Sequence, residues 1–551
     1  MTGLVTVFSQ PDMTTIETTT ETKSIGSLWS PLQTPVFRSL WVASTIASLG
    51  LWMQDIAGAW LMTSLSPTPV MVSLMQTATY LPFFLLSLPA GALADILDRR
   101  LIVLFSQIWM FFAVLGLAAL TLCGAMTAWM LILLIFILNL GGAMQAPAWN
   151  SMTPELVPES QLEPAIAIQS AGFNCARGLG AAFGGLITRQ FGPGLVFLID
   201  AAMMTVLGTA VFRWKREKTV NETPTERVLG AMKAGIRYVQ HSRPLRAVLV
   251  RTALFVFCAS AVWGLLPLLA RTVIHLDSSQ YGLTLTAFGG GTLFGAAILP
   301  RIRRVVSLDV LLNLGCALFA AGMFALAMSS NFALACVSMF WTGIGWMFSC
   351  NATYSAILMA SPLWVRARGV AIYLLVFQGC IAVGSPTWGA VADRLSMPYA
   401  LMIAAGILGL GCLANLRYRL IIVEQLDMRN SGPWPKVETS VTPHPDQGPV
   451  LVTIEYKIDP AKSADFAQSM GVLEKQRRRN GAFQWHLFIN LSAPGTYTES
   501  FFVETWSEYL RQRDRATVDD IAAENMVCHY HIDSEIPKIT RFISERRRSN
   551  Q

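Results

Sequence analysis

The chain has 551 residues, of which 53% are hydrophobic and only 14% are charged, and its formal net charge is +7. A soluble globular domain carries about 25% charged residues, so this composition excludes a disordered or purely soluble protein and indicates a membrane protein. The nine cysteines and six histidines form no CxxC or HxxxH pair. We therefore expect no disulfide framework, no metal site and no cofactor, and the basic excess does not by itself predict nucleic-acid binding.

Residues 1–36 are rich in threonine and lack the apolar stretch of a signal peptide, which predicts a disordered cytoplasmic tail. Two later stretches contain no Asp, Glu, Lys or Arg: Leu101 to Pro154, 54 residues, and Val310 to Val365, 56 residues. A helix that crosses a bilayer needs about 20 apolar residues, so each stretch predicts two spans and a tight turn. Twelve spans are predicted in all, at residues 38–61, 70–92, 101–122, 127–147, 165–187, 194–212, 247–269, 279–299, 308–328, 332–356, 369–391 and 398–416.

The basic residues predict the orientation of these spans. With a cytoplasmic N-terminus, the inner loops hold 18 Lys and Arg residues and the outer loops hold three, Arg189, Arg271 and Arg394. Since basic residues accumulate in cytoplasmic loops, both termini are expected in the cytoplasm and the chain in the cell (inner) membrane. The basic loop between the halves includes a helical stretch, Glu226 to Val239, which is expected to lie along the membrane surface.

The two halves of the chain are related by a constant offset of 204 residues. This offset pairs Gly91 with Gly295, Arg99 with Arg303, Arg100 with Arg304, Gly180 with Gly384 and Gly185 with Gly389. Parallel six-span repeats build alternating-access transporters, in which the substrate site lies between the halves. A channel or a membrane enzyme can also arise by duplication, but the repeat together with the span count favours a transporter.

The loop after the second span reads Gly91-Ala-Leu-Ala-Asp95-Ile-Leu-Asp98-Arg99-Arg100. A small residue lets two helix ends approach closely, and a carboxylate beside two arginines can form a charge lock on the inner face. The string resembles motif A of the major facilitator superfamily, with Asp98 where glycine is usual. The second copy of the string lacks the aspartate.

The fifth span contains glycines at a spacing that makes a groove for a neighbouring helix. The stretch from Ala176 to Gly185, with Gly180 and Gly184, resembles motif C of the antiporters in the same superfamily, although Ala181 replaces the usual proline. Pro386, in the eleventh span, supplies a proline in the second half. Packing between helices without any role in export is the alternative interpretation of these glycines.

Four longer patterns indicate which branch of the superfamily the chain resembles. They lie around Gln54-Asp55, Phe197 to Ala201, Leu265 to Arg271 and Val365 to Arg368. They are similar to the branch of the superfamily that holds the enterobactin exporter, the transmembrane secretion effector group, over about residues 30–420. The resemblance implies an inner-membrane efflux carrier for a siderophore, a secondary metabolite or an amphipathic drug, driven by proton influx.

Ionisable groups inside a bilayer are costly and are functional candidates. Asp55 and Asp200 are the candidates for proton coupling, the alternative being an Asp55 side chain hydrogen-bonded near the outer end of its span and an Asp200 with a structural partner. Arg177 shares a helix face with Asn174; it is expected either to attract an anionic substrate or to pair with Asp55 or Asp200. Arg251 is expected to extend to the interface.

Other polar and aromatic residues are expected either to line the cavity or to form contacts between helices. They are Gln54, Gln76, Tyr80, Asn139, Asn174, Trp346, Asn351, Tyr354 and Gln378.

A proline-rich linker over residues 420–448 leads to a soluble tail. Periodicity predicts a strand from Val450, a helix from Pro460, a strand pair over 482–506, one helix from Tyr509 to Val527 and a last strand over 536–543. This β-α-β-β-α-β order is ferredoxin-like. The stretch from Glu504 to Gln512 resembles the antibiotic-biosynthesis-monooxygenase group of dimeric α+β barrels, which implies a homodimer through the tails.

Six tail residues could line a catalytic pocket if the fold brought them together: Trp485, His486, Asn490, Trp506, His529 and His531. No spacing requires this, and a fold alone does not give a function. A regulatory, dimerising or substrate-capturing tail is favoured.

The predicted fold is an all-α membrane protein of twelve helices in two parallel repeats, followed by an α+β ferredoxin-like domain. The predicted organisation is a tail (1–36), an N-terminal bundle (37–212), a loop (213–246), a C-terminal bundle (247–419), a linker (420–448) and a cytoplasmic domain (449–545). The predicted function is proton-coupled export of a small molecule. The alternatives are an importer of the same fold and a bifunctional transporter with a monooxygenase-like tail.

Overall fold

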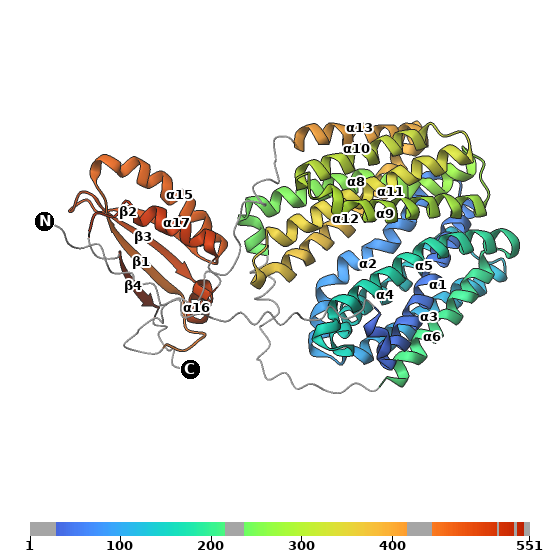
Figure 1. Ribbon diagram of the computed structural model, residues 1–551, viewed down its shortest axis with the longest axis horizontal. Helices are drawn as coiled ribbons and strands as arrows, with labels where there is room; N and C mark the ends of the chain where they lie inside the picture. Colours follow the sequence, from blue (N-terminus) through green and yellow to red (C-terminus); the bar gives the residue numbers. More distant parts are fainter. Residues whose placement is uncertain (1–28, 215–235, 416–442, 515–516, 534–536, 545–551) are drawn as a thin grey trace.

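The computed structural model describes residues 29–214, 236–415, 443–514, 517–533 and 537–544 (Figure 1). Three expected segments lie mostly outside these ranges: the N-terminal tail, the surface helix at Glu226 to Val239, and the linker. The rest forms two bundles of long helices and a small domain with a sheet.

The first bundle, called the N-half, is drawn in blue and teal in Figure 1. It consists of α1 (Pro35–Leu65), α2 (Pro69–Ile96), α3 (Arg99–Leu122), α4 (Ala128–Leu156), α5 (Leu162–Phe191) and α6 (Pro193–Arg213).

The second bundle, called the C-half, lies beside the first and is drawn in green to orange. It consists of α8 (Arg243–Thr272), α9 (Ser278–Ile302), α10 (Leu308–Ala327), α11 (Phe332–Met359), α12 (Leu363–Leu395) and α13 (Met397–Asn415). We call the end of the two bundles that faces the sheet domain the tail side, and the opposite end the far side.

Helix starts follow local sequence. Asp98, Thr127, Asp277, Ser307 and Asn331 each accept a hydrogen bond from a backbone N–H in the first turn of the helix that they precede. Such caps satisfy N–H groups that have no partner within the helix and contribute about 1 kcal/mol each. The helices α1, α2 and α6 begin instead with proline, and α8 has proline as its second residue; a proline has no N–H group that needs such a partner.

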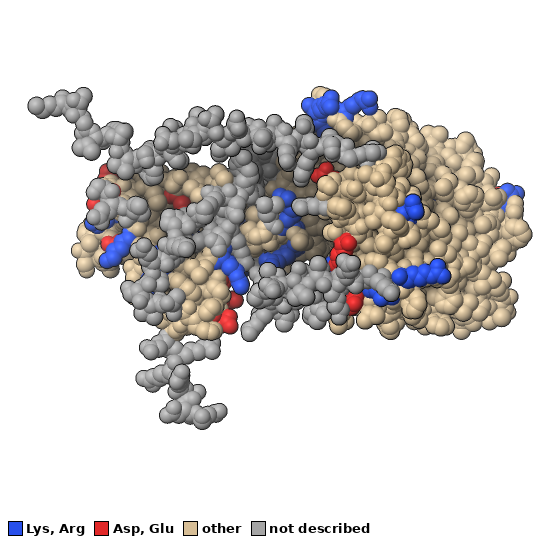
Figure 2. Space-filling view, turned by 60° about the horizontal axis from the view of Figure 1, so that its bottom comes forward, with Lys and Arg blue, Asp and Glu red and all other residues tan. Residues whose placement is uncertain are grey.

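Ten helices of the described residues are long and apolar enough to cross a membrane. Helix α5 is not among them because glycine, alanine and polar residues replace larger apolar ones along it, and α13 is shorter. Large apolar side chains point away from the bundles, and those of Phe112, Phe212 and Leu410 are 64%, 68% and 67% exposed. The surface of the bundles in Figure 2 is nearly free of charge, as expected where lipid replaces water.

Each bundle has its own buried core. Phe255, Phe319 and Phe348 are fully buried in the C-half, and Phe197 and Leu131 in the N-half. Arg251 is also buried, at 4% exposure, and its guanidinium lies 2.5 Å from the Asp309 carboxylate. The expected extension of Arg251 to the interface is therefore wrong, because α10 supplies a carboxylate partner inside the C-half.

The sheet domain contains β1 (Val450–Lys457), α15 (Ser463–Arg479), β2 (Phe483–Ile489), β3 (Thr496–Val503), α16 (Trp506–Asp514), α17 (Val518–Cys528) and β4 (Lys538–Ile543). Its four strands are antiparallel in the order β2-β3-β1-β4. Helix α15 packs Phe466, Met470 and Leu473 against one face of the sheet. The observed element order thus follows the predicted pattern, with one difference.

The difference is that α16 and α17 replace the single helix expected from Tyr509 to Val527. Thr517 starts a new helix as its N-cap, and Asp520 completes a capping box with it. The Asp520 side chain accepts from both the backbone N–H and the hydroxyl of Thr517. These bonds favour a helix start at this point over a continuous helix.

The sheet domain contacts the tail side of the C-half. Arg237 lies 3.4 Å from Glu508 of α16. Tyr238, which is fully buried, packs edge-on against Trp364 of α12 and lies under the guanidinium of Arg479. The domain therefore docks on the bundle that contains α8 and α12.

Candidate functional site

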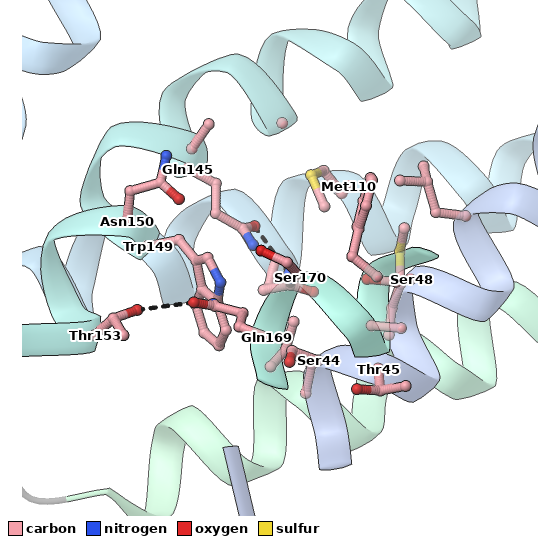
Figure 3. Close-up of a pocket in the computed structure, with 18 of the residues that line it drawn as sticks. Ser44, Thr45, Ser48, Met110, Gln145, Trp149, Asn150, Thr153, Gln169 and Ser170 are labelled. Carbon is pink, nitrogen blue, oxygen red and sulfur yellow. Dashed lines mark hydrogen bonds between the residues drawn. The ribbon is translucent and has the colours of Figure 1, made fainter. Parts of the chain in front are cut away.

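A cavity of about 700 Å³ lies in the tail-side part of the N-half (Figure 3). Its lining residues come from α1 to α6 and none of them is charged. Six amides and five hydroxyl side chains supply the polar wall: Gln107, Asn139, Gln145, Asn150, Gln169, Asn174, Ser44, Thr45, Ser48, Thr153 and Ser170. The wall offers neutral donors and acceptors to a polar ligand.

Two side-chain pairs hold this wall in place. Gln107 donates to Gln145 at 2.8 Å, and Thr153 donates to Gln169 at 3.2 Å. Both bonds are drawn in Figure 3. Since each bond joins two helices, the amides are positioned before a ligand arrives. Of this wall, only Asn139 and Asn174 were predicted as cavity residues from the sequence.

Arg177 lies halfway along α5, next to the cavity. Its Nη2 donates to Asn174 and to Thr292 of α9, both at 3.1 Å, and its guanidinium lies 5.9 Å from the centre of the Trp52 ring. Asn174 was predicted as its neighbour and lines the cavity. Thr292 belongs to the C-half, so Arg177 joins the two halves.

Asp55 of α1 lies in the same central region. Its carboxyl group lies within electrostatic range of the hydroxyl groups of Tyr80 of α2 and Tyr281 of α9. Arg177 interacts in the same way with Tyr80 and with Cys350 of α11. The structure therefore brings together three predicted residues, Asp55, Tyr80 and Arg177, at the boundary between the halves.

Asp200 lies elsewhere. It is fully buried in α6 against Gly50 of α1, and within the described residues neither carboxylate oxygen has a hydrogen-bond partner. A Cβ on Gly50 would come within 2.4 Å of its Oδ1. The Arg177–Asp200 pair considered from the sequence does not form, because Arg177 bonds to Asn174 and Thr292.

The remaining predicted cavity residues differ in their surroundings. Gln54 is 3% exposed, and the buried Oε1 of Gln378 has no hydrogen-bond partner among the described residues. Tyr354 packs edge-on against Tyr373 and is 42% exposed. Trp346 is surrounded by rings of the C-half: Phe255, Trp263, Phe288, Phe319 and Phe377.

The motif A arginines bind within the N-half. Arg99 forms an ion pair with Glu155 of α4 at 2.7 Å. Arg100 donates to the carbonyls of Val211 and Phe212 at the end of α6, and Asp98 caps α3. These bonds tie the ends of α3, α4 and α6 together on the tail side.

The motif glycines differ in what they contact. A Cβ on Gly91 would meet nothing within 4 Å, so the close approach expected there is absent. A Cβ on Gly295 would lie 3.3 Å from Met347 of α11. The side chain of Asp95 lies outside the described part.

The motif C glycines pack α5 against two helices. A Cβ on Gly180 or Gly184 would come within 3 Å of the α1 backbone, and one on Gly185 within 2.4 Å of the Ser278 carbonyl of α9. Gly282 of α9 faces Gly185 in return. These glycines therefore allow contact both inside the N-half and between the halves.

Further contacts, which were not predicted from the sequence, join the halves towards the far side. Arg271 of α8 donates to Thr63 at 3.0 Å and also to Ser64, and its guanidinium lies 5.5 Å from the Trp60 ring. Arg189 of α5 pairs with Asp277 at 3.2 Å. The sequence did offer a signal for these contacts, because both arginines lie in predicted outer loops, which hold only three basic residues.

Three of the six tail residues considered for catalysis take part in contacts within the sheet domain. Trp485 donates to Glu499 at 2.9 Å, and His531 accepts from the backbone of Lys457 at 2.9 Å. Trp506 is buried beside Tyr509. Across the described residues, no group of three or more His, Cys, Asp or Glu side chains is placed to hold a metal ion.

The chain thus combines two bundles of long apolar helices with a polar cavity and with charged groups close to the boundary between the bundles. The transmembrane secretion effector family matches residues 26–549, and the chain belongs to this family of the major facilitator superfamily. It is a multi-pass membrane transporter of the efflux and secretion type, and its relatives are transporters rather than enzymes.

The chain is 26% identical over 287 residues to the uncharacterized MFS-type transporter YfiS of Bacillus subtilis (strain 168), which covers 50% of this chain and 67% of that one. It is 21% identical to macrolide efflux protein A of Streptococcus pyogenes, over 48% of this chain and 65% of that one. It is 22% identical to the staphyloferrin A transporter of Staphylococcus aureus (strain NCTC 8325 / PS 47), over 64% of this chain and 88% of that one. The first two alignments thus span about two thirds of each relative.

Solved structures share the fold. A bacterial homolog of the human lysosomal transporter Spinster, in an inward-facing and unoccupied conformation, has a TM-score of 0.52 at 15% identity and covers 71% of this chain and 95% of that one. A mutant form of the nucleoside transporter NupG has a TM-score of 0.59 at 12% identity and covers 70% of this chain and 99% of that one.

Proposed function

We propose that the protein is a secondary active exporter of the inner membrane that works by alternating access. The observation that carries this proposal is the distribution of contacts between the halves. These contacts lie at the middle of the bundles and towards the far side: Arg177–Thr292, Gly185–Gly282 and Arg271–Thr63. The cavity, in contrast, lies on the tail side. A carrier in this state takes up its cargo from the tail side.

In this proposal all twelve long helices cross the membrane as two parallel six-helix repeats, and the tail side is cytoplasmic. The concentration of basic residues in the tail-side loops supports the orientation. Two of the three basic residues on the other side, Arg189 and Arg271, are held by contacts between the halves. Their positions therefore have a structural reason within the same orientation.

Proton influx drives export, with Asp55 as the coupling residue. This assignment is supported by its proximity to Tyr80 of the N-half and Tyr281 of the C-half, because a change of its charge would act on both halves. Asp200 is the second proton candidate, but it packs behind α1 against Gly50 and away from the C-half. We therefore assign coupling to Asp55.

The motif A arginines form the gate on the cytoplasmic side. Arg99 and Arg100 brace the ends of α3, α4 and α6, so that the N-half moves as a unit when the tail side closes. Arg303 and Arg304 occupy the equivalent place in the second repeat.

The cargo is a siderophore, a secondary metabolite or an amphipathic drug. The neutral polar wall of the N-half and the aromatic cluster around Trp346 of the C-half support an amphipathic cargo. The relatives include a macrolide efflux protein and a staphyloferrin A transporter, which supports export of a small molecule of this size class.

The test uses everted membrane vesicles energised with a pH gradient, acid inside, and a panel of dyes and siderophores. We expect uptake of at least one compound that collapses with an uncoupler. Accumulation only in right-side-out vesicles would show an importer instead.

We also propose that two chains pair through the tail. The sheet face opposite α15 carries a row of apolar side chains across four strands, Phe542, Leu451, Phe502 and Phe483. Phe542 is 52% exposed. Light scattering of the full chain in detergent is expected to give a dimer, and Phe502→Lys a monomer; a wild-type monomer contradicts the pairing.

A further inference from the structure

Arg177 is a charge inside the membrane region whose nearest partners are all neutral. Its two hydrogen bonds go to an amide oxygen and a hydroxyl oxygen, and its ring contact is with an indole. None of its described contacts is an ion pair with a carboxylate. A buried cation without an anionic partner is unfavourable, and such residues commonly mark the path of a substrate or an ion.

The guanidinium also keeps donors free. It has five N–H groups, and the two hydrogen bonds use Nη2 alone. The N–H of Nε and the two of Nη1 are therefore available to a ligand. A planar group of this kind binds a carboxylate through two parallel hydrogen bonds, which a neutral ester cannot reproduce.

The location fits the same ligand. Asn174 both lines the cavity and accepts a hydrogen bond from Arg177, so the guanidinium lies directly beside a residue of the cavity wall. Among the described residues, no acidic side chain lines that cavity. An anion entering it meets neutral amides and hydroxyls, with the Arg177 guanidinium beside Asn174.

We propose that the cargo is an organic anion that carries a carboxylate together with hydroxyl, carbonyl or amide groups. Its carboxylate binds Arg177, and its neutral polar groups bind the amide wall around Gln145 and Gln169. Because Arg177 also bonds to Thr292 of the C-half, the bound carboxylate lies at the joint between the halves. This inference rests on the proposed export function and names its substrate class.

The test measures binding to the purified full chain in nanodiscs by dansyl fluorescence. The probes are N-dansyl derivatives of glutamate, aspartate and serine, each paired with the neutral ester in which every carboxyl group is methylated. We expect at least one acid to bind ten times or more tightly than its ester, which corresponds to about 1.4 kcal/mol. Arg177→Gln is expected to abolish the difference, and Arg177→Lys to keep part of it.

Two further variants test whether the effect is specific to the Arg177 guanidinium. Thr292→Val keeps the guanidinium and is expected to keep the preference for the acid. Arg394→Gln, at an exposed position in the last turn of α12, is the control for removal of a positive charge. Equal binding of acid and ester, no binding of any acid, or an unchanged preference in Arg177→Gln overturns the inference. Any of these results could occur together with proton-driven uptake of neutral or cationic dyes. That combination would support the export function and refute only the anionic cargo.

Discussion

At the scale of single residues, the two membrane aspartates have different surroundings. Asp55 interacts with tyrosines from both halves, whereas Asp200 is buried in the α1–α6 contact with no hydrogen-bond partner for its oxygens among the described residues. A group that couples protons to movement has to interact with the parts that move. Asp200 of α6 lies against Gly50 of α1, and both residues belong to the N-half.

We therefore predict that Asp200→Asn keeps at least half of the wild-type rate of proton-driven uptake. The amide has nearly the shape of the carboxyl group, so the packing against Gly50 is retained. Initial rates in everted vesicles test this, with protein amount checked by immunoblot. A loss of uptake in Asp200→Asn would move the coupling role to α6.

Some of these residues could be predicted from the sequence and others could not. Asn174 is three residues before Arg177, so a shared helix face was predictable. Thr292 is 115 residues further on in another bundle, and no local pattern relates the two. The same holds for Asp309 and Arg251, whose pairing depends on the packing of α8 against α10.

At the scale of elements, the contact between α5 and α9 depends on Gly185 and Gly282. A Cβ on Gly185 would lie 2.4 Å from the Ser278 carbonyl and 3.1 Å from the Gly282 Cα. Backbone atoms cannot move aside without separating the helices, so Gly185→Ala should open the far side.

We predict a longer distance between spin labels at Gln190 and His275 in Gly185→Ala, measured by pulsed electron paramagnetic resonance on a chain without its nine cysteines. Gly178→Ala is the matched control on the same helix, because its Cβ would meet nothing within 4 Å. Identical distance distributions in the two variants would contradict the role given to Gly185.

A second prediction at this scale concerns the start of α17. Thr517→Ala removes the hydroxyl of the capping box, and the loss of such a cap costs about 1 kcal/mol. Hydrogen exchange of the α17 amides should then be about five times faster, since that free energy corresponds to a factor of about five. Val518→Ala, at a 40% exposed position, is the control; unchanged exchange in Thr517→Ala would count against the cap.

The element order was largely predictable, because helix periods, caps and strand alternation are local. The break between α16 and α17 was not predicted, although Thr517 and Asp520 stand three residues apart as a capping box requires.

At the scale of the whole molecule, the sheet domain is attached to the C-half. Tyr238 is packed between Trp364 of α12 and Arg479 of the domain, and its side chain is fully buried. The Arg237–Glu508 pair is partly exposed, and such pairs contribute about 0–1 kcal/mol. Tyr238 should therefore dominate the docking.

We predict that Tyr238→Ala releases the domain, with faster hydrogen exchange at residues 236–241 and 479–481, whereas Glu508→Gln changes it little. Equal effects of the two variants would show that the charge pair, rather than the tyrosine, holds the domain.

Proton-coupled export through Asp55 is tested most directly by the uptake of one transported compound into everted vesicles under a pH gradient, comparing wild type, Asp55→Asn and Asp200→Asn. The account predicts that an uncoupler abolishes wild-type uptake, that Asp55→Asn accumulates nothing while it still exchanges cargo down its gradient, and that Asp200→Asn resembles wild type. Uphill accumulation by Asp55→Asn at the wild-type rate would contradict it.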